Sequence, residues 1–396
     1  MVSLMLNIRA LHVSWGKMQG VFLHRRVFTQ MKKETVTTNQ ITEGVIWKQL
    51  LLFFFPIVLG TFFQQLYNTA DTIVVGRFVS KEALAAVGGS AAQIVGLIVG
   101  FFVGLASGAS VIISQFYGAK NRVQLNRALH TAYAFSIIGS IFITVLGILI
   151  APWMLELMHT PQETMADALL YLRIYFAGII FVFIYNVGSS ILRAMGDSRR
   201  PLYYLIVCCF LNIVLDIVLV IVFHMGVAGV SIATIFSQGV SAVLITRALM
   251  HSDDLYQLEF RKIRFHKAAL ISLIWVGCPT GIQSVLYSVT NMLIQTFLNN
   301  LGTDTVAAWS AFGKIDSLYW MVNNAFGIAV TTFVGQNFGA GKYDRMKKSV
   351  RIGLCMGLCT ALTLTLIFYN FGTPLFRLFT SDENVVSIGM QMLYHV

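Results

Sequence analysis

The chain has 396 residues, of which 57% are hydrophobic and only 11% are charged, with a mean hydropathy of +0.74. Soluble domains carry about 25% charged residues, so this chain has too few charges to cover a water-facing surface. The composition therefore excludes a soluble enzyme and a disordered scaffold, and it predicts an all-α protein that crosses a membrane many times. The net charge of +11 lies largely in short loops, where basic residues act as topology signals, so we expect no nucleic-acid partner.

The chain begins with a segment, residues 1–48, that we interpret as an N-terminal cytoplasmic extension. Residues 1–30 contain neither a span nor a cleavage signal, and Met31 starts an ordinary bacterial N-terminus, which suggests an upstream extension of the reading frame. Apolar runs bounded by charged or turn residues then predict ten helical spans. The spans lie near 49–76, 84–115, 129–151, 168–192, 201–223, 227–249, 268–298, 305–337, 350–370 and from 384 onward.

Basic residues are divided unequally between the loops. The loops after the second, fourth, sixth and eighth spans carry most of them, whereas the intervening loops hold only Arg77, Lys81 and Arg377. Cytoplasmic loops of membrane proteins carry an excess of Lys and Arg. The asymmetry therefore predicts a multi-pass protein of the cytoplasmic membrane with its N-terminus in the cytoplasm.

An internal repeat relates the two halves of the chain. The sequence QFYGAK at 115–120 matches QNFGAG at 336–341. Pro56 matches Pro279, and the two matches are offset along the chain by nearly the same number of residues. Both halves start on the same side of the membrane, so the repeats are parallel, as in transporters that bind substrate between two such halves.

The repeat defines the expected domain organisation. We predict a first lobe of six membrane helices at 49–250, a basic cytoplasmic linker at 251–267, and a second lobe at 268–396. The second lobe holds about three and a half helices, so symmetry with the first lobe marks it as truncated at the C-terminus.

Small residues inside the spans point to packing. All five cysteines lie in apolar runs, so we expect neither a disulfide nor a zinc site. Gly96, Gly100, Gly104 and Gly108 recur every four residues and therefore share one face of the second span. Such a stripe allows two helix backbones to approach closely in lipid.

Polar residues inside the spans are more informative, because a charged side chain at the centre of a bilayer costs about 2.5–3.5 kcal/mol on insertion scales. Asp71 in the first span shares a helix face with Gln64 and Asn68, and Asp216 lies in the fifth span one turn after Asn212. Three further polar residues can turn toward the same interior, namely Asn186, Thr234 and Gln238.

This oxygen-rich set suits a small cation, with sodium possible at Asp71, Asn212 and Asp216. The same carboxylates, buried close together, can instead bind protons. A hydrogen-bonded network without an ion is the third interpretation. In the second lobe, Asp316 is a candidate for a second site, although a structural pairing with Lys314 is the favoured interpretation.

Three segments resemble signature sequences of the multidrug and toxic compound extrusion (MATE) family, DinF-like branch. They are FQQLYNTADTIVVGR at 63–77, ILRAMGDSRRP at 191–201 and VGQNFGAG at 334–341, and the similarity covers most of the chain from about residue 45. The resemblance implies two six-helix lobes, alternating access, and export of organic cations or drugs against an inflow of sodium or protons. It also implies a monomer in the lipid bilayer that needs no cofactor besides the coupling ion.

The resemblance assigns roles to single residues. Asp71, Asn186, Asn212, Asp216 and Thr234 occupy the cation-binding positions of the family. Pro56 resembles a proline that bends the first helix, and its repeat partner Pro279 is a second candidate hinge. The candidates for substrate contact in the cleft are Gln64, Tyr67, Asn68, Gln238, Gln283 and Asp316.

Other functions compete with this interpretation. A flippase of lipid-linked precursors, from the same fold superfamily, would favour a cationic cavity, whereas the charges inside these spans are mainly acidic. A non-transporting scaffold or receptor would not need polar residues on four spans. An intramembrane aspartyl protease would need a Gly-x-Gly-Asp element, and the sequence contains neither this nor a hydrolase or nucleotide-binding motif, so we expect no enzymatic activity.

Overall fold

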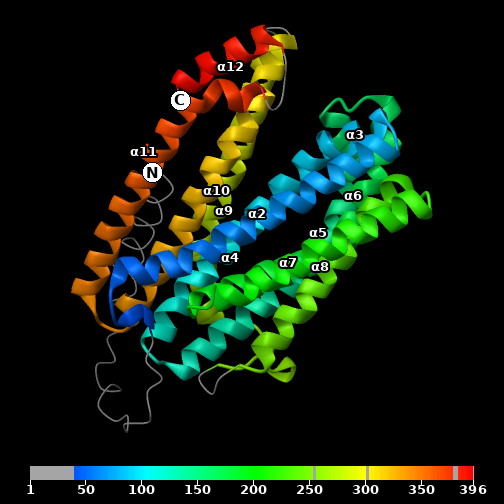
Figure 1. Ribbon diagram of the computed structural model, residues 1–396. Helices are drawn as coiled ribbons and strands as arrows, with labels where there is room; N and C mark the ends of the chain where they lie inside the picture. The colour runs from blue at the N-terminus through cyan, green and yellow to red at the C-terminus, as the bar shows by residue number, and fades with distance from the viewer. Residues whose placement is uncertain (1–39, 253–255, 300–302, 378–381, 396) are drawn as a thin grey trace.

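The computed structural model describes residues 40–252, 256–299, 303–377 and 382–395, and within these ranges all regular structure is helical (Figure 1). The all-α prediction is thus confirmed. The expected upstream extension at 1–30 lies outside the described residues.

The first lobe contains the helices α2 (Ile46–Phe78), α3 (Lys81–Gly88), α4 (Ser90–Gly118), α5 (Arg122–Leu157), α6 (Gln162–Ala194), α7 (Arg199–Asp216) and α8 (Gly226–Met250). The second lobe contains α9 (Lys267–Asn299), α10 (Thr303–Gly339), α11 (Tyr343–Arg377) and α12 (Glu383–His395). Three short helical turns complete the described structure: η1 (Gln40–Thr42), η2 (Ile217–Val222) and η3 (Phe260–Lys262).

Eight helical segments in the described residues are long and apolar enough to cross a membrane. Two of the ten expected spans are not among them. The span expected at 305–337 forms α10, whose apolar run is interrupted by polar side chains, and α12 has only 13 residues. The span expected at 84–115 is divided into α3 and α4, because the chain bends at Gly89, where an added Cβ would lie 2.4 Å from the Ala85 carbonyl oxygen.

The two lobes touch at one end and diverge toward the other. Figure 1 shows α10, α11 and α12 leaning away from the first lobe toward the end at which α12 lies. At the opposite end, where α4 and α10 terminate, the two copies of the repeated motif meet. A Cβ on Gly118 would lie 2.0 Å from the Gln336 carbonyl oxygen, and one on Gly339 would lie 1.9 Å from that of Gln115. This reciprocal contact is the arrangement that a two-fold related pair of repeats produces.

The glycine stripe of α4 makes the close helix contact that its spacing predicts. A Cβ on Gly104 or on Gly108 would lie 2.5 Å from backbone atoms of α9, at Gly281 and Gly277 respectively. Toward the start of α4 the helices separate, since a Cβ on Gly96 would meet nothing within 4 Å. The prediction of tight packing is therefore confirmed for the part of the stripe nearest the closed end.

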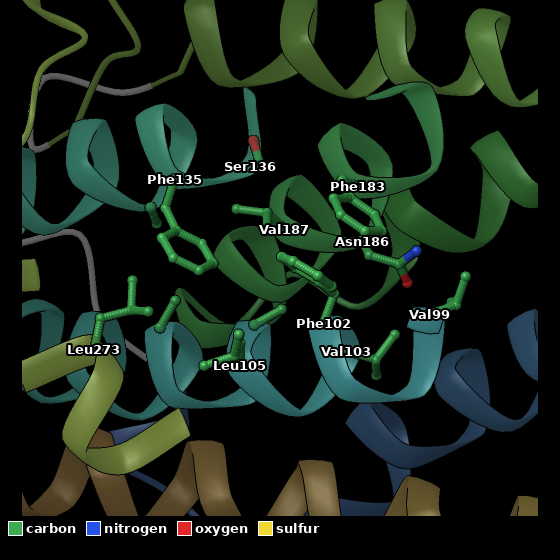
Figure 2. Close-up of a pocket in the computed structure, with 13 residues that line it drawn as sticks. Val99, Phe102, Val103, Leu105, Phe135, Ser136, Phe183, Asn186, Val187 and Leu273 are labelled. Carbon is green, nitrogen blue, oxygen red and sulfur yellow. The ribbon is translucent and has the colours of Figure 1, made fainter. Parts of the chain in front are cut away.

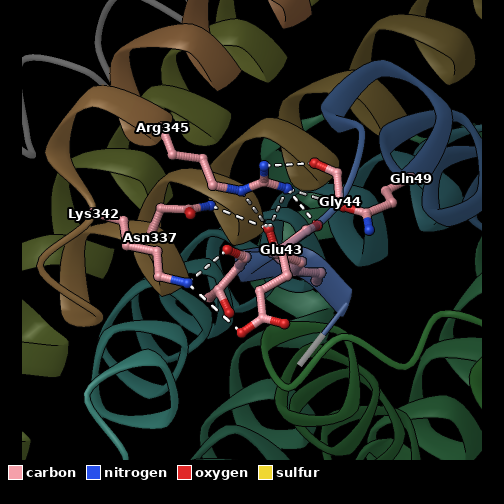
Figure 3. A network of polar contacts seen from close by, with 8 residues as sticks. Glu43, Gly44, Gln49, Asn337, Lys342 and Arg345 are labelled. Atoms are coloured by element: carbon pink, nitrogen blue, oxygen red, sulfur yellow. Dashed lines mark hydrogen bonds and ion pairs between the residues drawn. The ribbon is translucent and has the colours of Figure 1, made fainter. Parts of the chain in front are cut away.

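A polar network joins the lobes at the closed end (Figure 3). The Arg345 guanidinium of α11 donates hydrogen bonds to the carbonyl oxygens of Ile41 and Gly44, at 3.2 and 2.7 Å, and to Gln49 Oε1 at 3.1 Å. Lys342 Nζ donates to the Thr42 carbonyl oxygen at 2.9 Å. The last part of the expected extension at 1–48 is thus folded against the second lobe.

Candidate functional site

Three helices of the first lobe bring four predicted cation-site residues together. Asp71 lies in α2, Asn212 and Asp216 lie in the last turns of α7, and Thr234 lies in α8. All four side chains are buried: Asn212 and Asp216 are 0% exposed, Thr234 is 5% exposed and Asp71 is 7% exposed. We call these four residues the acid cluster.

The acid cluster is held by few hydrogen bonds. Thr234 Oγ1 donates to Asp71 Oδ2 at 3.1 Å, and the side chains of Asn212 and Asp216 lie next to the Asp71 carboxylate. Asp71 Oδ1, both carboxylate oxygens of Asp216 and both polar side-chain atoms of Asn212 are buried and have no hydrogen-bond partner among the described residues.

The acid cluster also has no positive partner within the described part of the chain, where the ion pairs all lie outside it. Two adjacent carboxylates without a counter-charge are costly to bury. A small cation held by hard oxygen ligands, or a proton on one carboxylate, would remove that cost. The residues therefore fit either coupling ion that the sequence predicts.

A π-helical segment follows the acid cluster directly. The α-helix α7 ends at Asp216, and η2 continues it in π-helical form from Ile217 to Val222. Single π-turns inside helices are rare and occur frequently at functional sites. The sequence IVLVIV carries no signal for this change, so sequence reasoning missed it.

A second polar contact lies one turn from the acid cluster. Gln238 Nε2 of α8 donates to the Tyr67 hydroxyl of α2 at 3.0 Å. Tyr67 precedes Asp71 by four residues and Gln238 follows Thr234 by four, so this bond runs parallel to the one between Thr234 and Asp71. Both side chains are buried, at 5% and 4% exposure, and they support the acid cluster inside the lobe.

Other predicted site residues lie elsewhere. Gln64 and Asn68 are exposed on α2, although their spacing places them near the face of Asp71. Gln283 on α9 and Asp316 on α10 are half-buried in the second lobe. These four cleft candidates therefore lie outside the acid cluster, whereas the other two, Tyr67 and Gln238, are buried beside it.

The pairing of Asp316 with Lys314 that the sequence favours is not formed among the described residues. The Trp320 side chain instead forms a hydrogen bond with the Asp316 carboxylate from one turn further along α10. The rings of Trp320 and Tyr287 of α9 lie edge to face with centroids 5.5 Å apart.

Asn186 lines a mainly apolar pocket instead of joining the acid cluster. Figure 2 shows this pocket, which residues of α4, α5 and α6, among them Phe102, Phe135 and Phe183, line together with Leu273 of α9. Asn186 Nδ2 donates to the Val182 carbonyl oxygen of its own helix at 2.8 Å.

The two candidate hinge prolines lie inside long helices. Pro56 falls within α2 and Pro279 within α9, and both helices continue past them. Each proline removes one backbone hydrogen bond, which weakens the helix at that point. Pro279 also lies between Gly277 and Gly281, where α9 contacts α4 most closely.

Comparison with known proteins connects this arrangement to a family. A family model described as MatE matches residues 56–218 and 279–396. The probable multidrug resistance protein YoeA of Bacillus subtilis is 28% identical over 373 residues, which cover 92% of this chain and 80% of YoeA. The probable multidrug resistance protein YpnP of the same organism is 32% identical over 354 residues, which cover 89% of this chain and 78% of YpnP. This chain also resembles a FAD transporter of Shewanella oneidensis, at 24% identity over 86% of this chain and 76% of the transporter.

Solved structures show the same fold. The outward-facing conformation of a multidrug resistance MATE family transporter of the MOP superfamily matches with a TM-score of 0.83 at 23% sequence identity. The match covers 91% of this chain and 80% of the solved one.

Proposed function

This chain belongs to the MatE family, and we propose that it is an antiporter that exports organic cations or drugs across the cytoplasmic membrane in exchange for sodium or protons. The observation that carries the proposal is the acid cluster, in which Asp71 and Asp216 are buried side by side without a positive partner in the described residues. Multidrug relatives that share most of the chain support the cargo class.

Exchange requires that the ion and the cargo favour different conformations. In the proposed mechanism, the coupling ion binds Asp71 and Asp216 and stabilises the packing of α2, α7 and α8 around them. The cargo binds in the space between the lobes and favours a different arrangement of the same helices. Each ligand then lowers the affinity for the other, and this coupling is reciprocal by thermodynamic necessity.

The basic loops support an orientation for this cycle. Lys120 and Arg122 follow α4, and Lys342 and Arg345 follow α10, so these residues lie next to the contact of Gly118 with Gln336 at which the two lobes are closed. With the basic loops in the cytoplasm, as the positive-inside rule requires, the lobes are closed toward the cytoplasm and apart toward the outside. We propose that the structure is the outward-open state of a monomer.

Ethidium transport in vesicles tests the function. We expect the full chain, reconstituted in lipid vesicles, to export ethidium when either a sodium or a proton gradient is applied. Asp71→Asn and Asp216→Asn should abolish the dependence on the gradient. Asp344→Asn, a matched change at an exposed acid of α11, should leave transport unchanged.

The result also separates the alternatives. A flippase of lipid-linked precursors or a non-transporting scaffold predicts no gradient-driven ethidium movement by the folded wild-type protein. That outcome, or unchanged gradient dependence in both acid variants, would overturn the proposal.

A further inference from the structure

The basic linker between the lobes is folded against the first lobe. The Glu259 amide donates a hydrogen bond to His130 Nε2 at 3.1 Å, and the His266 amide donates to Thr131 Oγ1 at 3.1 Å. Both acceptors lie near the start of α5, so they hold the two ends of the segment 259–266 on the same helix. The side chains between these ends are exposed or half-buried, and we call residues 260–267 the linker tip.

Aromatic and basic side chains are exposed together on the linker tip. Phe260 is 58% exposed and Phe265 is 41% exposed. Arg261, Arg264 and Lys267 are also exposed, and none of them pairs with an acid within the described residues. Apolar rings beside lysines and arginines are typical of protein surfaces that bind at the boundary between lipid headgroups and acyl chains.

The charge of this surface is positive. Glu259, just before the linker tip, forms an ion pair with Lys262, and the linker tip itself contains no acid. Burial and the charges of Arg264 and Arg127 lower the pKa of His266, so Arg127, an exposed residue of α5, adds a further cation beside the linker tip. A surface of this composition fits a partner that combines negative charge with an apolar layer.

The start of α9 sets the depth of the linker tip in the bilayer. Ile271 and Trp275 are 46% and 59% exposed, and helical spacing places them on the same face of this membrane-crossing helix as Lys267. Leu52, the repeat partner of Trp275 at the offset of the two prolines, is likewise 55% exposed, so this face meets lipid in both lobes. Lys267 precedes Ile271 by one helical turn, about 6 Å along the axis, which places the linker tip at the level of the lipid headgroups. The linker tip lies on the closed side of the protein, because α5 begins just after Gly118.

We propose that the linker tip binds anionic phospholipid headgroups of the cytoplasmic leaflet. Arg261, Arg264 and Lys267 contact the lipid phosphates, and the rings of Phe260 and Phe265 enter the boundary between headgroups and acyl chains. The linker tip is fixed to α5 and continues into α9, so a lipid bound there contacts elements of both lobes. This inference concerns the membrane and neither the cargo nor the coupling ion, so it goes beyond the proposed function.

Binding of a labelled lipid tests this surface. The purified full chain, in micelles of detergent and phosphatidylcholine, would be titrated with dansyl-labelled phosphatidylglycerol, and energy transfer from the tryptophans would report binding. Each lysine or arginine near an anionic membrane strengthens binding about fivefold, so we expect Arg261→Gln with Lys267→Gln to weaken it about 25-fold. Phe260→Ser with Phe265→Ser should weaken it as well. Dansyl-labelled phosphatidylcholine, which has no net charge, should bind the wild type more weakly than the anionic lipid.

A matched control removes the same charge elsewhere. Lys347→Gln with Lys348→Gln changes two exposed lysines at the start of α11 and should leave binding within about twofold of the wild type, because salt screens charges that lie far from the bound lipid. Wild-type affinity for phosphatidylglycerol in both linker variants, or an equal loss in the α11 variant, would overturn the proposal. Displacement of the lipid by millimolar glycerol 3-phosphate would assign the linker tip to a soluble anion and would overturn the proposal too.

Discussion

Arg345 provides a direct test of what holds the two lobes together. Its guanidinium donates hydrogen bonds to the carbonyl oxygens of Ile41, Glu43 and Gly44 and to the side chain of Gln49. These acceptors belong to the segment that leads into α2, whereas Arg345 belongs to α11. Arg345→Ala therefore removes a set of bonds that exists only while the lobes are closed at this end.

The contacts set the size of the effect. The bonds to Glu43 and Gly44 are exposed, so water replaces them at little cost. The bonds to Ile41 and Gln49 are partly buried, and the Ile41 oxygen keeps a second donor, Asn337 Nδ2, at 3.4 Å. We estimate a loss of about 2 kcal/mol, which corresponds to a shift of about 30-fold in the balance between closed and separated ends.

Spin-label distances measure that balance. Labels at Val123 and Tyr343, which are 60% and 54% exposed near the closed end, would report the separation of the lobes in a variant without native cysteines. We expect Arg345→Ala to add a population with a longer distance. Arg351→Ala, at an exposed arginine of the same helix, is the control. An identical distance distribution in the wild type and Arg345→Ala would refute this account of the closed end.

Two further predictions follow from the packing and the linker. Gly104→Ala should lower the stability by about 1–3 kcal/mol in thermal unfolding, because the added Cβ would clash with the α9 backbone. Gly96→Ala, where the Cβ meets nothing, should be neutral or stabilising. Equal changes in stability for the two variants would contradict the α4–α9 contact. Burial, together with nearby positive charges, lowers the pKa of His266 below its usual 6.5. Neutral His266 therefore favours docking of its end of the linker on Thr131, and protonation opposes this docking as the pH falls from 6.5 through the lowered pKa. The His266 amide donates to Thr131 Oγ1 at 3.1 Å, and its hydrogen exchange, corrected for intrinsic rates, should accelerate over that pH range. The Leu258 amide, which is bonded to a backbone carbonyl, should stay protected. Equal protection of both amides at every pH would contradict this role of His266.

The sequence predicted most of the membrane helices and turned all four residues of the acid cluster toward one interior. Long apolar runs determine membrane helices strongly, because each span must satisfy its own backbone hydrogen bonds. The i, i+4 spacing of Asn212 and Asp216 placed both on one face of α7, and the cost of burying acids pointed them toward Asp71. The glycine period likewise predicted the face of α4 that contacts α9.

Other features depend on tertiary geometry that local patterns do not encode. Asn186 has the polarity of a cation ligand, but α6 turns it toward an apolar pocket between helices. The π-helical turn after Asp216 and the folding of Ile41 against the second lobe leave no mark in composition or periodicity. Tyr287 and Trp320 lie on different helices, so only the structure shows that they meet.

Ion binding at the acid cluster tests the central claim most directly. Tryptophan fluorescence of the purified chain would be followed in separate titrations with sodium and with acid, beside Asp216→Asn. We predict a saturable response to sodium, to protons or to both that the variant lacks. No response to either ion in a folded wild-type protein, or the same response in Asp216→Asn, would contradict a coupling site at Asp71 and Asp216.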